Sequence, residues 1–290
     1  MPPAAAPAVV LVNPNTSAAT TRMMTGIARR ALAGTGLRLR GVTVAAGPPM
    51  LTDPAALRAA VPHVLSAARR ALAAGDCAAL IVAAFGDPGV PELRENLGPL
   101  GAPGRAPGPE RVPVPVPVPL PVPVDPVSAF GDPGVPELRE DPGPLGAPGR
   151  EPRTVPVPGV PVPVPVVGIG EAALAEAAAG GRRFGIATTT PLLAASIDAL
   201  VTRLGLTAGY TGARFTAGAP ERLSAHPAVL LAALETAARA CVVRDGAEVV
   251  VIGGGPLGDA AEALGSRLAV PVVAPVPAAC RWIAQALGRA

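Results

Sequence analysis

The sequence predicts an α/β fold in which two similar halves each carry a parallel sheet, interrupted by a long proline-rich insertion. Three observations predict it. Short apolar runs bounded by turn residues alternate with Ala/Leu/Arg segments of helical periodicity, which is typical of parallel α/β organisation. Segments of the first part of the chain recur in the second part. Finally, 22 of the 39 prolines lie between Pro99 and Pro165, and the remainder are thinly spread.

The alternating pattern predicts eight strands and seven helices. Four of the expected helices begin with Pro, which suits the first helical turn because that position needs no N–H donor. The expected strands are 8–12, 37–44, 78–84, 162–168, 183–188, 206–212, 247–253 and 270–276. The expected helices are 17–33, 54–73, 171–179, 191–204, 227–244, 257–268 and 277–287.

Weak internal repeats relate the two halves. The stretch VPVV at 164–167 recurs at 270–273, and IVAAFGDPG from Ile81 resembles VVIGGGPLG from Val250. The strand that ends at NPNTS likewise pairs with the one that ends at Thr188. Such repetition at the scale of whole strands indicates pseudo-twofold symmetry. We therefore expect a first half over residues 1–96, joined by the C-terminal helix 277–290, and a second half over residues 162–276.

The segment 97–161 is expected to be an unstructured insertion. AFGDPGVPELRE at 84–95 recurs unchanged at 129–140, and each copy leads into alternating Val-Pro. Alternating proline removes every second N–H, which favours extended polyproline II over helix or sheet. The insertion is either a docking strip for an aromatic-lined groove or a duplication tolerated in a long surface loop, and the second interpretation is favoured. Only the first copy follows an apolar strand, so it is the copy expected in the fold.

Composition excludes several classes of function. Half of the residues are apolar, 16% are charged and the net charge is +3. Every basic residue is Arg, so no Lys is present to form a Schiff base. The sequence has neither the basic stripe nor the stacking aromatic residues that are typical of nucleic-acid binding. No proline-poor apolar run is long enough to span a membrane. Three widely spaced cysteines argue against disulfides and zinc, and they suit a reducing cytoplasm.

Four motifs in order resemble one family. NPNTS at 13–17, FGDPG at 85–89, VVGIGEAA at 166–173 and a Thr run at 188–190 follow successive strands. This arrangement resembles the aspartate/glutamate racemase superfamily, and most closely its hydantoin and allantoin racemase branch. The resemblance implies two Rossmann-like halves that face each other across a cleft, and a cofactor-independent racemase or epimerase that acts on hydantoin- or aspartate-like amino-acid derivatives.

The same resemblance places two catalytic cysteines at positions that here hold other residues. Racemisation needs two acid/base groups, one on each face of the stereocentre. In the family both are thiols, and the matching positions are Ala84 and Gly254. Neither residue can exchange a proton, so activity is expected to be altered or lost. The alternative is a non-catalytic protein that binds small carboxylates on the racemase fold, and a third candidate is an interaction protein built around the Val-Pro insertion.

Residues at the ends of strands are the candidates for substrate binding. Hydroxyl and N–H groups that open a helix can hold an anion such as a carboxylate, although the same residue types also serve as ordinary N-caps. Glycines let a backbone loop approach a ligand closely. The expected partner is a small molecule with a carboxylate or imide group, no metal is expected, and a homo-oligomer remains open. The candidate binding residues are Asn15, Thr16, Ser17, Phe85, Gly86, Thr188, Thr189, Gly253 and Gly255.

Carboxylates are weaker candidates for proton transfer. Asp87, Glu171 and Asp259 lie near the expected loop ends, where a role in ordering loops is favoured over catalysis. Cys77, just before a strand, is expected to be core filler, as are Cys241 and Cys280, because free cysteines are usually buried. His63 and His226 lie in or beside helices and are expected to be structural.

Overall fold

Two four-stranded parallel sheets with the same strand order organise the chain. The structure, a computed structural model, describes residues 8–97 and 164–289, which all belong to one compact unit. The expected insertion therefore lies outside the described residues, except for its first position, and so does the second AFGDPG copy. The first sheet has the order β2-β1-β3-β4 and the second has β6-β5-β7-β8. This correspondence confirms the α/β fold of two pseudo-symmetric halves.

Each strand of the first sheet has a counterpart in the second. All pairings are parallel, as expected where helices form the crossovers. The first sheet consists of β1 (Ala8–Asn13), β2 (Arg38–Thr43), β3 (Cys77–Val82) and β4 (Val166–Gly168). The second consists of β5 (Phe184–Thr188), β6 (Tyr210–Phe215), β7 (Val249–Gly253) and β8 (Val272–Val273).

Nine α-helices and four short 3-10 helices connect these strands within the described part of the chain. The α-helices are α1 (Ala18–Ala31), α2 (Pro54–Ala73), α3 (Val90–Leu97), α4 (Ile169–Ala178), α5 (Ala194–Arg203), α6 (Pro220–Ser224), α7 (Pro227–Val243), α8 (Gly258–Gly265) and α9 (Pro275–Ala286). The 3-10 helices are η1 (Ala179–Gly181), η2 (Pro191–Leu193), η3 (Thr207–Gly209) and η4 (Gly255–Leu257).

Position in the sheet explains the composition of each strand. The central strands β1, β5 and β7 are buried along their whole length and consist almost entirely of apolar residues. The edge strands β2 and β6 are mostly half-buried, and both carry Arg. The buried core is dominated by Ala, Val, Leu and Ile, as the shortage of aromatic residues predicts. Each fully buried Val, Leu or Ile contributes about 1.5–3 kcal/mol of hydrophobic stabilisation.

The expected boundary between the halves is wrong. Residues 162–276 were expected to form the second half, but β4 pairs with β3 in the first sheet, with Leu80 beside Val166 and Ile81 beside Val167. The reason is that a long insertion between two segments does not prevent them from pairing, because closing a longer loop costs little additional free energy. The repeat that matches 164–167 with 270–273 had already assigned β4 correctly, since those segments become β4 and β8, the last strands of their sheets.

Several element boundaries also differ from expectation. The strand expected at 206–212 begins only at Tyr210, because Gly205, with φ of +71°, ends α5 and the 3-10 helix η3 intervenes. The last strand is confined to two residues because the final helix starts at Pro275. The sequence analysis did not anticipate α3 and α6, which both follow short turns at the ends of strands.

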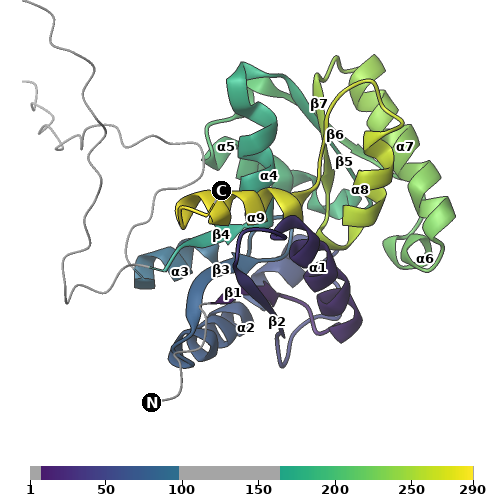
Figure 1. Ribbon diagram of the computed structural model, residues 1–290. Coiled ribbons are helices and arrows are strands. Elements are labelled where there is room, and N and C mark those ends of the chain that lie inside the picture. The colour runs from purple at the N-terminus through teal and green to yellow at the C-terminus, as the bar shows by residue number, and fades with distance from the viewer. Residues whose placement is uncertain (1–7, 98–163, 290) are drawn as a thin grey trace, which may run out of the picture. The chain divides into compact units, whose positions relative to one another are not determined.

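The final helices of the two sheets pack against each other. In Figure 1, α9 lies beside α4 and β4. It also packs against α1 and touches β3, whereas α4 reaches the second sheet at β7. Because each final helix contacts elements of both sheets, the halves share a continuous core. Buried residues from β1, β3, β5, β7, α4 and α9 belong to a single cluster.

Candidate functional site

A cavity of about 210 Å³ lies where the strands of both sheets end. Its walls come from the segments that follow β1 and β3 in the first sheet and β5 and β7 in the second. In parallel α/β proteins, ligands bind beyond the carboxyl ends of the strands. The cavity is lined by Asn15, Ser17, Thr20, Met23, Pro49, Met50, Leu51, Ala83, Ala84, Phe85, Thr189, Thr190, Leu193, Pro220, Ser224, Gly253, Gly254, Gly255, Pro256 and Leu257.

The wall after β1 is held by a buried asparagine. The Asn13 amide nitrogen donates to Oδ1 of Asn15 at 2.9 Å and to Oγ1 of Thr21 at 3.0 Å. Oδ1 of Asn15 also accepts from the Ser17 N–H, and the Ser17 hydroxyl caps α1 by accepting from the Thr20 N–H. Capping is therefore confirmed for Ser17. The Asn15 amide nitrogen has no hydrogen-bond partner within the described residues and remains able to donate to a ligand.

The wall after β5 is tied to the loop after β7. The Thr188 hydroxyl donates to the Gly253 carbonyl at 2.6 Å, which couples the ends of two adjacent strands. Thr188 is buried behind this bond, whereas Thr189 and Thr190 line the cavity. The two halves thus present hydroxyl-bearing segments at corresponding positions, one beginning at Asn15 and the other at Thr189.

The two positions that match the family's catalytic cysteines border the same cavity. Ala84 follows β3 and Gly254 follows β7, so the structure brings them to one site. Gly254 has φ of +144°, a conformation that residues with a side chain rarely adopt. A Cβ there would also lie 3.0 Å from the Leu257 side chain. The backbone at this position is therefore suited to glycine.

Three of the nine candidate binding residues do not line the cavity. Thr16 donates its backbone N–H to the Pro48 carbonyl, and Thr188 lies behind the wall as described above. Gly86, with φ of +111°, faces the Leu57 side chain. The remaining six, Asn15, Ser17, Phe85, Thr189, Gly253 and Gly255, all border the cavity.

The described residues of the cavity wall supply hydrogen-bonding side chains rather than acids or bases. Among the described residues that line it, the polar side chains are those of Asn, Ser and Thr, and no Asp, Glu, His, Cys or Arg contributes. Such a wall can orient a carboxylate, an imide or a carbonyl group through hydrogen bonds. It offers no side chain that exchanges a proton near neutral pH.

Asp87 and Glu171 form a buried network outside the cavity. Asp87, with φ of +53°, accepts from the Gly170 N–H at 2.8 Å and from the Glu171 N–H at 2.7 Å. Glu171 accepts from the Gly168 N–H at 2.9 Å and forms an ion pair with Arg94. Arg94 also donates to the Val166 carbonyl at 2.7 Å. The network joins the loop after β3 to the start of α4.

Burial determines the ionisation of Asp87. Its side chain is excluded from solvent, and this desolvation, together with the nearby Glu171 charge, raises the pKa of Asp87 to about 8. The two N–H donors act in the opposite direction without reversing the shift. Because neither carboxyl group lines the cavity, the geometry favours the role in ordering loops over direct proton transfer to a bound molecule.

The remaining titratable candidates lie away from the cavity. Asp259 is exposed and forms an ion pair with Arg30 at 2.5 Å. Cys241 and Cys280 are buried, which confirms them as core residues, and burial raises their pKa to about 11 and about 12. Cys77 is the first residue of β3 rather than the residue before it, and lies at the opposite end of that strand from Ala84.

The histidines also lie outside the cavity wall. His63 lies within α2 and faces Gly47, and His226 precedes α7. No group of three or more His, Cys, Asp or Glu residues that could hold a metal ion occurs within residues 8–97 and 164–289. In the same ranges, every helix is too short or too polar to cross a membrane.

The sequence analysis missed the outer wall of the cavity. Pro49, Met50 and Leu51 follow β2, and Pro220 and Ser224 lie beyond β6. The segments after β2 and β6 therefore border the same cavity as the segments after β1, β3, β5 and β7. The pseudo-symmetry could have pointed to both segments, because β2 and β6 occupy equivalent edges of the two sheets.

The fold and the cavity define a class of protein: an α/β protein with two equivalent parallel sheets and a cavity at their carboxyl ends. The sequence matches the family described as Asp/Glu/Hydantoin racemase over residues 9–100 and 127–283. The chain therefore belongs to the Asp/Glu/hydantoin racemase family. No curated protein sequence matches it significantly.

Solved structures of similar fold agree with this assignment. Allantoin racemase from Klebsiella pneumoniae has 22% identity and a TM-score of 0.69, covering 98% of this chain and 89% of its own. Allantoin racemase from Pseudomonas fluorescens has 22% identity and a TM-score of 0.67, covering 97% and 91%. Glutamate racemase RacE1 from Bacillus anthracis has 9% identity and a TM-score of 0.56, covering 97% and 82%. At these identities the likeness shows the fold.

Proposed function

We propose that this racemase-family chain binds a small hydantoin- or aspartate-like amino-acid derivative in the cavity and does not racemise it by a two-thiol mechanism. One observation carries this proposal: none of the described residues that line the cavity has a titratable side chain. Removing the proton from the stereocentre and returning one on the other face requires an acid/base group on each side. Neither Ala84 nor Gly254 has a side chain that can act as an acid/base group.

The polar wall supports recognition of a carboxylate or imide group. The Asn15 amide nitrogen and the Thr189 hydroxyl come from opposite sheets, so they can hold two different ends of one molecule. The start of α1 adds N–H groups of favourable polarity for an anion. Apolar side chains such as Phe85 and Leu193 complete the wall and exclude water from a bound molecule.

Binding can be tested with named compounds. We expect 5-methylhydantoin or L-aspartate to bind in isothermal titration calorimetry. Thr189→Val removes one hydroxyl from the cavity and keeps the shape of the side chain, so affinity should fall roughly ten-fold. Thr202→Val makes the same change on the exposed face of α5 and should leave affinity unchanged. Absence of binding by both compounds would contradict the proposal, and so would equal effects of the two substitutions.

A second candidate is a cofactor-independent racemase whose chemistry has changed. It is favoured by one observation, namely that Asp87 lies three residues after Ala84 with its pKa raised to about 8. Transfer of deuterium from solvent to the α-carbon of aspartate or of 5-methylhydantoin distinguishes the two candidates. We expect no transfer above the rate without protein. Transfer that is lost in Asp87→Asn would support the racemase and overturn the binding protein.

A further inference from the structure

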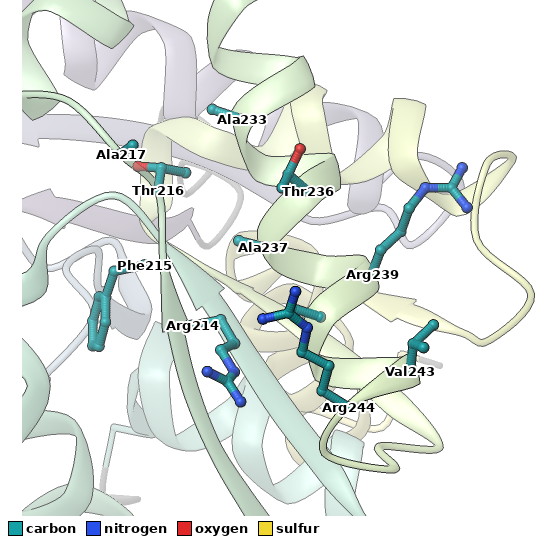
Figure 2. A pocket seen from close by; sticks show the side chains of 11 residues that line it. Arg214, Phe215, Thr216, Ala217, Ala233, Thr236, Ala237, Arg239, Val243 and Arg244 are labelled. Carbon is teal, nitrogen blue, oxygen red and sulfur yellow. The ribbon is translucent and has the colours of Figure 1, made fainter.

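A second, larger hollow lies in the second half, between the edge strand β6 and helix α7. Its volume is about 610 Å³, within the range of about 300–1,000 Å³ that is typical of ligand pockets. Figure 2 shows residues of β6 and the following loop on one side and a stripe of α7 on the other. None of its lining residues belongs to the cavity described above. We call it the β6–α7 groove.

Small apolar side chains make up the α7 side of the groove. The face of α7 that borders the groove carries short apolar side chains at helical spacing, namely Ala233, Ala237 and Ala240. Short side chains leave space between this helix and β6. Val243 continues the stripe and is 82% exposed, so most of its apolar surface is in contact with water. An apolar molecule in the groove would remove this surface from water, a change that favours binding.

Cationic side chains stand at one end of the groove. Arg214, Arg239 and Arg244 all line it, and no acidic side chain does so among the described residues. In Figure 2 the Arg239 side chain extends away from the groove, whereas those of Arg214 and Arg244 lie between the helix and the strand. The groove therefore combines an apolar floor with positive charge at one end.

The two inward guanidinium groups differ in what they are free to bind. Arg214 is oriented by Asp245, to which its Nε donates at 2.8 Å and its Nη2 also donates. The Arg244 guanidinium makes no hydrogen bond or ion pair within the described part of the chain, although its charge acts on Asp245, and its side chain is exposed. One carboxylate thus serves two neighbouring cations, which leaves a net positive charge and a whole guanidinium fork available for an anion.

We propose that the β6–α7 groove is a separate binding site for an amphipathic carboxylate, with Arg244 as its main anion contact. The carboxylate matches the planar guanidinium group of Arg244, and an aliphatic body covers the alanine stripe and Val243. A second copy of the chain is a poorer occupant, because a symmetric contact through this face would bring the arginines of both copies together. The proposal does not depend on the function proposed for the smaller cavity.

Octanoate is a suitable probe, because it combines a carboxylate with an aliphatic body. We expect it to bind the full chain in isothermal titration calorimetry. Octan-1-ol, which lacks the charge, and acetate, which lacks the body, should both bind at least ten-fold more weakly. Binding of octan-1-ol as tight as that of octanoate would overturn the role of the arginines, and absence of octanoate binding at millimolar concentration would overturn the site.

Matched substitutions locate the probe. Arg244→Gln should weaken octanoate binding roughly ten-fold, whereas Arg29→Gln, the same change on exposed α1, should not alter it. Ala240→Leu fills the groove and should reduce binding strongly, whereas Ala232→Leu lies on the exposed face of the same helix and should not. Equal effects within either pair would contradict the proposal.

A further substitution separates the groove from the smaller cavity. Ala84→Leu narrows the cavity between the two sheets, so octanoate affinity should be unchanged if the probe lies in the β6–α7 groove. Loss of octanoate binding in Ala84→Leu, with Arg244→Gln still binding normally, would place the probe in the cavity and overturn the proposal.

Discussion

The loops that follow β3 and β7 occupy equivalent places in the two halves but are held by different means. After β3, the Asp87 carboxyl group accepts the N–H groups of Gly170 and Glu171, which open α4. The position that corresponds to Asp87 in the second half is Leu257, whose side chain cannot accept a hydrogen bond. The loop after β7 is held instead at its backbone, where Gly253 accepts from Thr188.

The starts of the two final helices explain this difference. The first N–H groups of any helix lack partners within the helix. At α4 those donors are present and Asp87 and Glu171 accept from them. At α9 the residues equivalent to Ile169 and Glu171 are Pro275 and Pro277, which carry no N–H. In the first half, buried carboxyl groups accept from the N–H donors at the start of α4. In the second half, prolines eliminate two of the corresponding N–H donors at the start of α9. The same topology therefore tolerates different side chains in the loop.

The largest effect is expected from removal of Glu171. Glu171→Ala leaves Arg94 without its partner and the Gly168 N–H without an acceptor, which should lower the free energy of unfolding by about 3–5 kcal/mol. Glu176→Ala breaks the more exposed Glu176–Arg281 pair and should cost about 1 kcal/mol or less. Urea unfolding measures both. Similar losses would show that the buried network contributes no more than a surface ion pair.

The next effect concerns the glycine that makes room for Asp87. A Cβ at Gly168 would overlap the Asp87 carboxyl group, so Gly168→Ala should lower the free energy of unfolding by about 1–3 kcal/mol. Gly265→Ala lies in α8, where a Cβ meets nothing within 4 Å, and should be neutral or slightly stabilising. If both variants unfold at the same urea concentration, the close packing of Asp87 against the start of α4 is not an important constraint.

Cysteine substitutions at the two matched positions should also differ. Gly254→Cys forces a side chain into a backbone with φ of +144° and should cost about 1–3 kcal/mol. Ala84→Cys meets no such strain and should cost less than about 1 kcal/mol. Thermal unfolding compares the two single variants. Equal stability would mean that the loop after β7 relaxes readily.

The double variant Ala84→Cys with Gly254→Cys tests the chemistry of the site. If the cavity keeps a productive geometry, it should begin to exchange the α-proton of aspartate or 5-methylhydantoin with solvent deuterium. Each single variant is the control, because one thiol serves only one face of the stereocentre. An inactive double variant that is folded would argue that the glycine loop no longer positions a group for proton transfer.

A pH dependence of stability is also expected from Asp87, in the first half. Because the pKa of Asp87 is raised to about 8 in the folded chain from its ordinary value of 3.8, its contribution to stability is complete below that ordinary value. The contribution is lost as the pH rises through about 8, with a slope of at most about 1.4 kcal/mol per pH unit. Asp87→Asn should flatten this slope in urea unfolding between pH 4.5 and 8. An unchanged slope would assign it to another group.

Other shifted groups act outside this window. The pKa of Glu235 is lowered first by hydrogen bonds from Arg239 and Arg267, and that of Asp245 by the hydrogen bond from Arg214. Their contributions are present above the ordinary carboxyl pKa and are lost only in acid. The buried thiols are shifted upward from 9.0, so they remain protonated throughout. Among the described groups whose pKa is shifted, Asp87 is the one that titrates between pH 4.5 and 8.

Patterns that depend on local chemistry could be predicted well. Helix α2 has the expected bounds, Pro54–Ala73, because Asp53 caps it and Pro54 suits its first turn. The strand-end segments at Asn15 and Thr189 were anticipated because hydroxyl and amide side chains follow buried strands. The assignment of β4 to the second half was wrong, because the local sequence pattern does not show which strands pair across a long insertion. The repeat that matches 164–167 with 270–273 was the one signal that indicated the correct assignment.

The sequence alone determined the alternation of strands and helices, the internal pairing of the two halves and the absence of thiols at positions 84 and 254. Each follows from residue type or from repetition along the chain. Only the tertiary structure decided that Asp87 is turned onto the start of α4, that Gly254 has a backbone conformation suited to glycine, and that arginines from β6 and the end of α7 border one groove. Those features depend on contacts between residues that are far apart in sequence, where direction and burial, rather than residue type, decide what a side chain does.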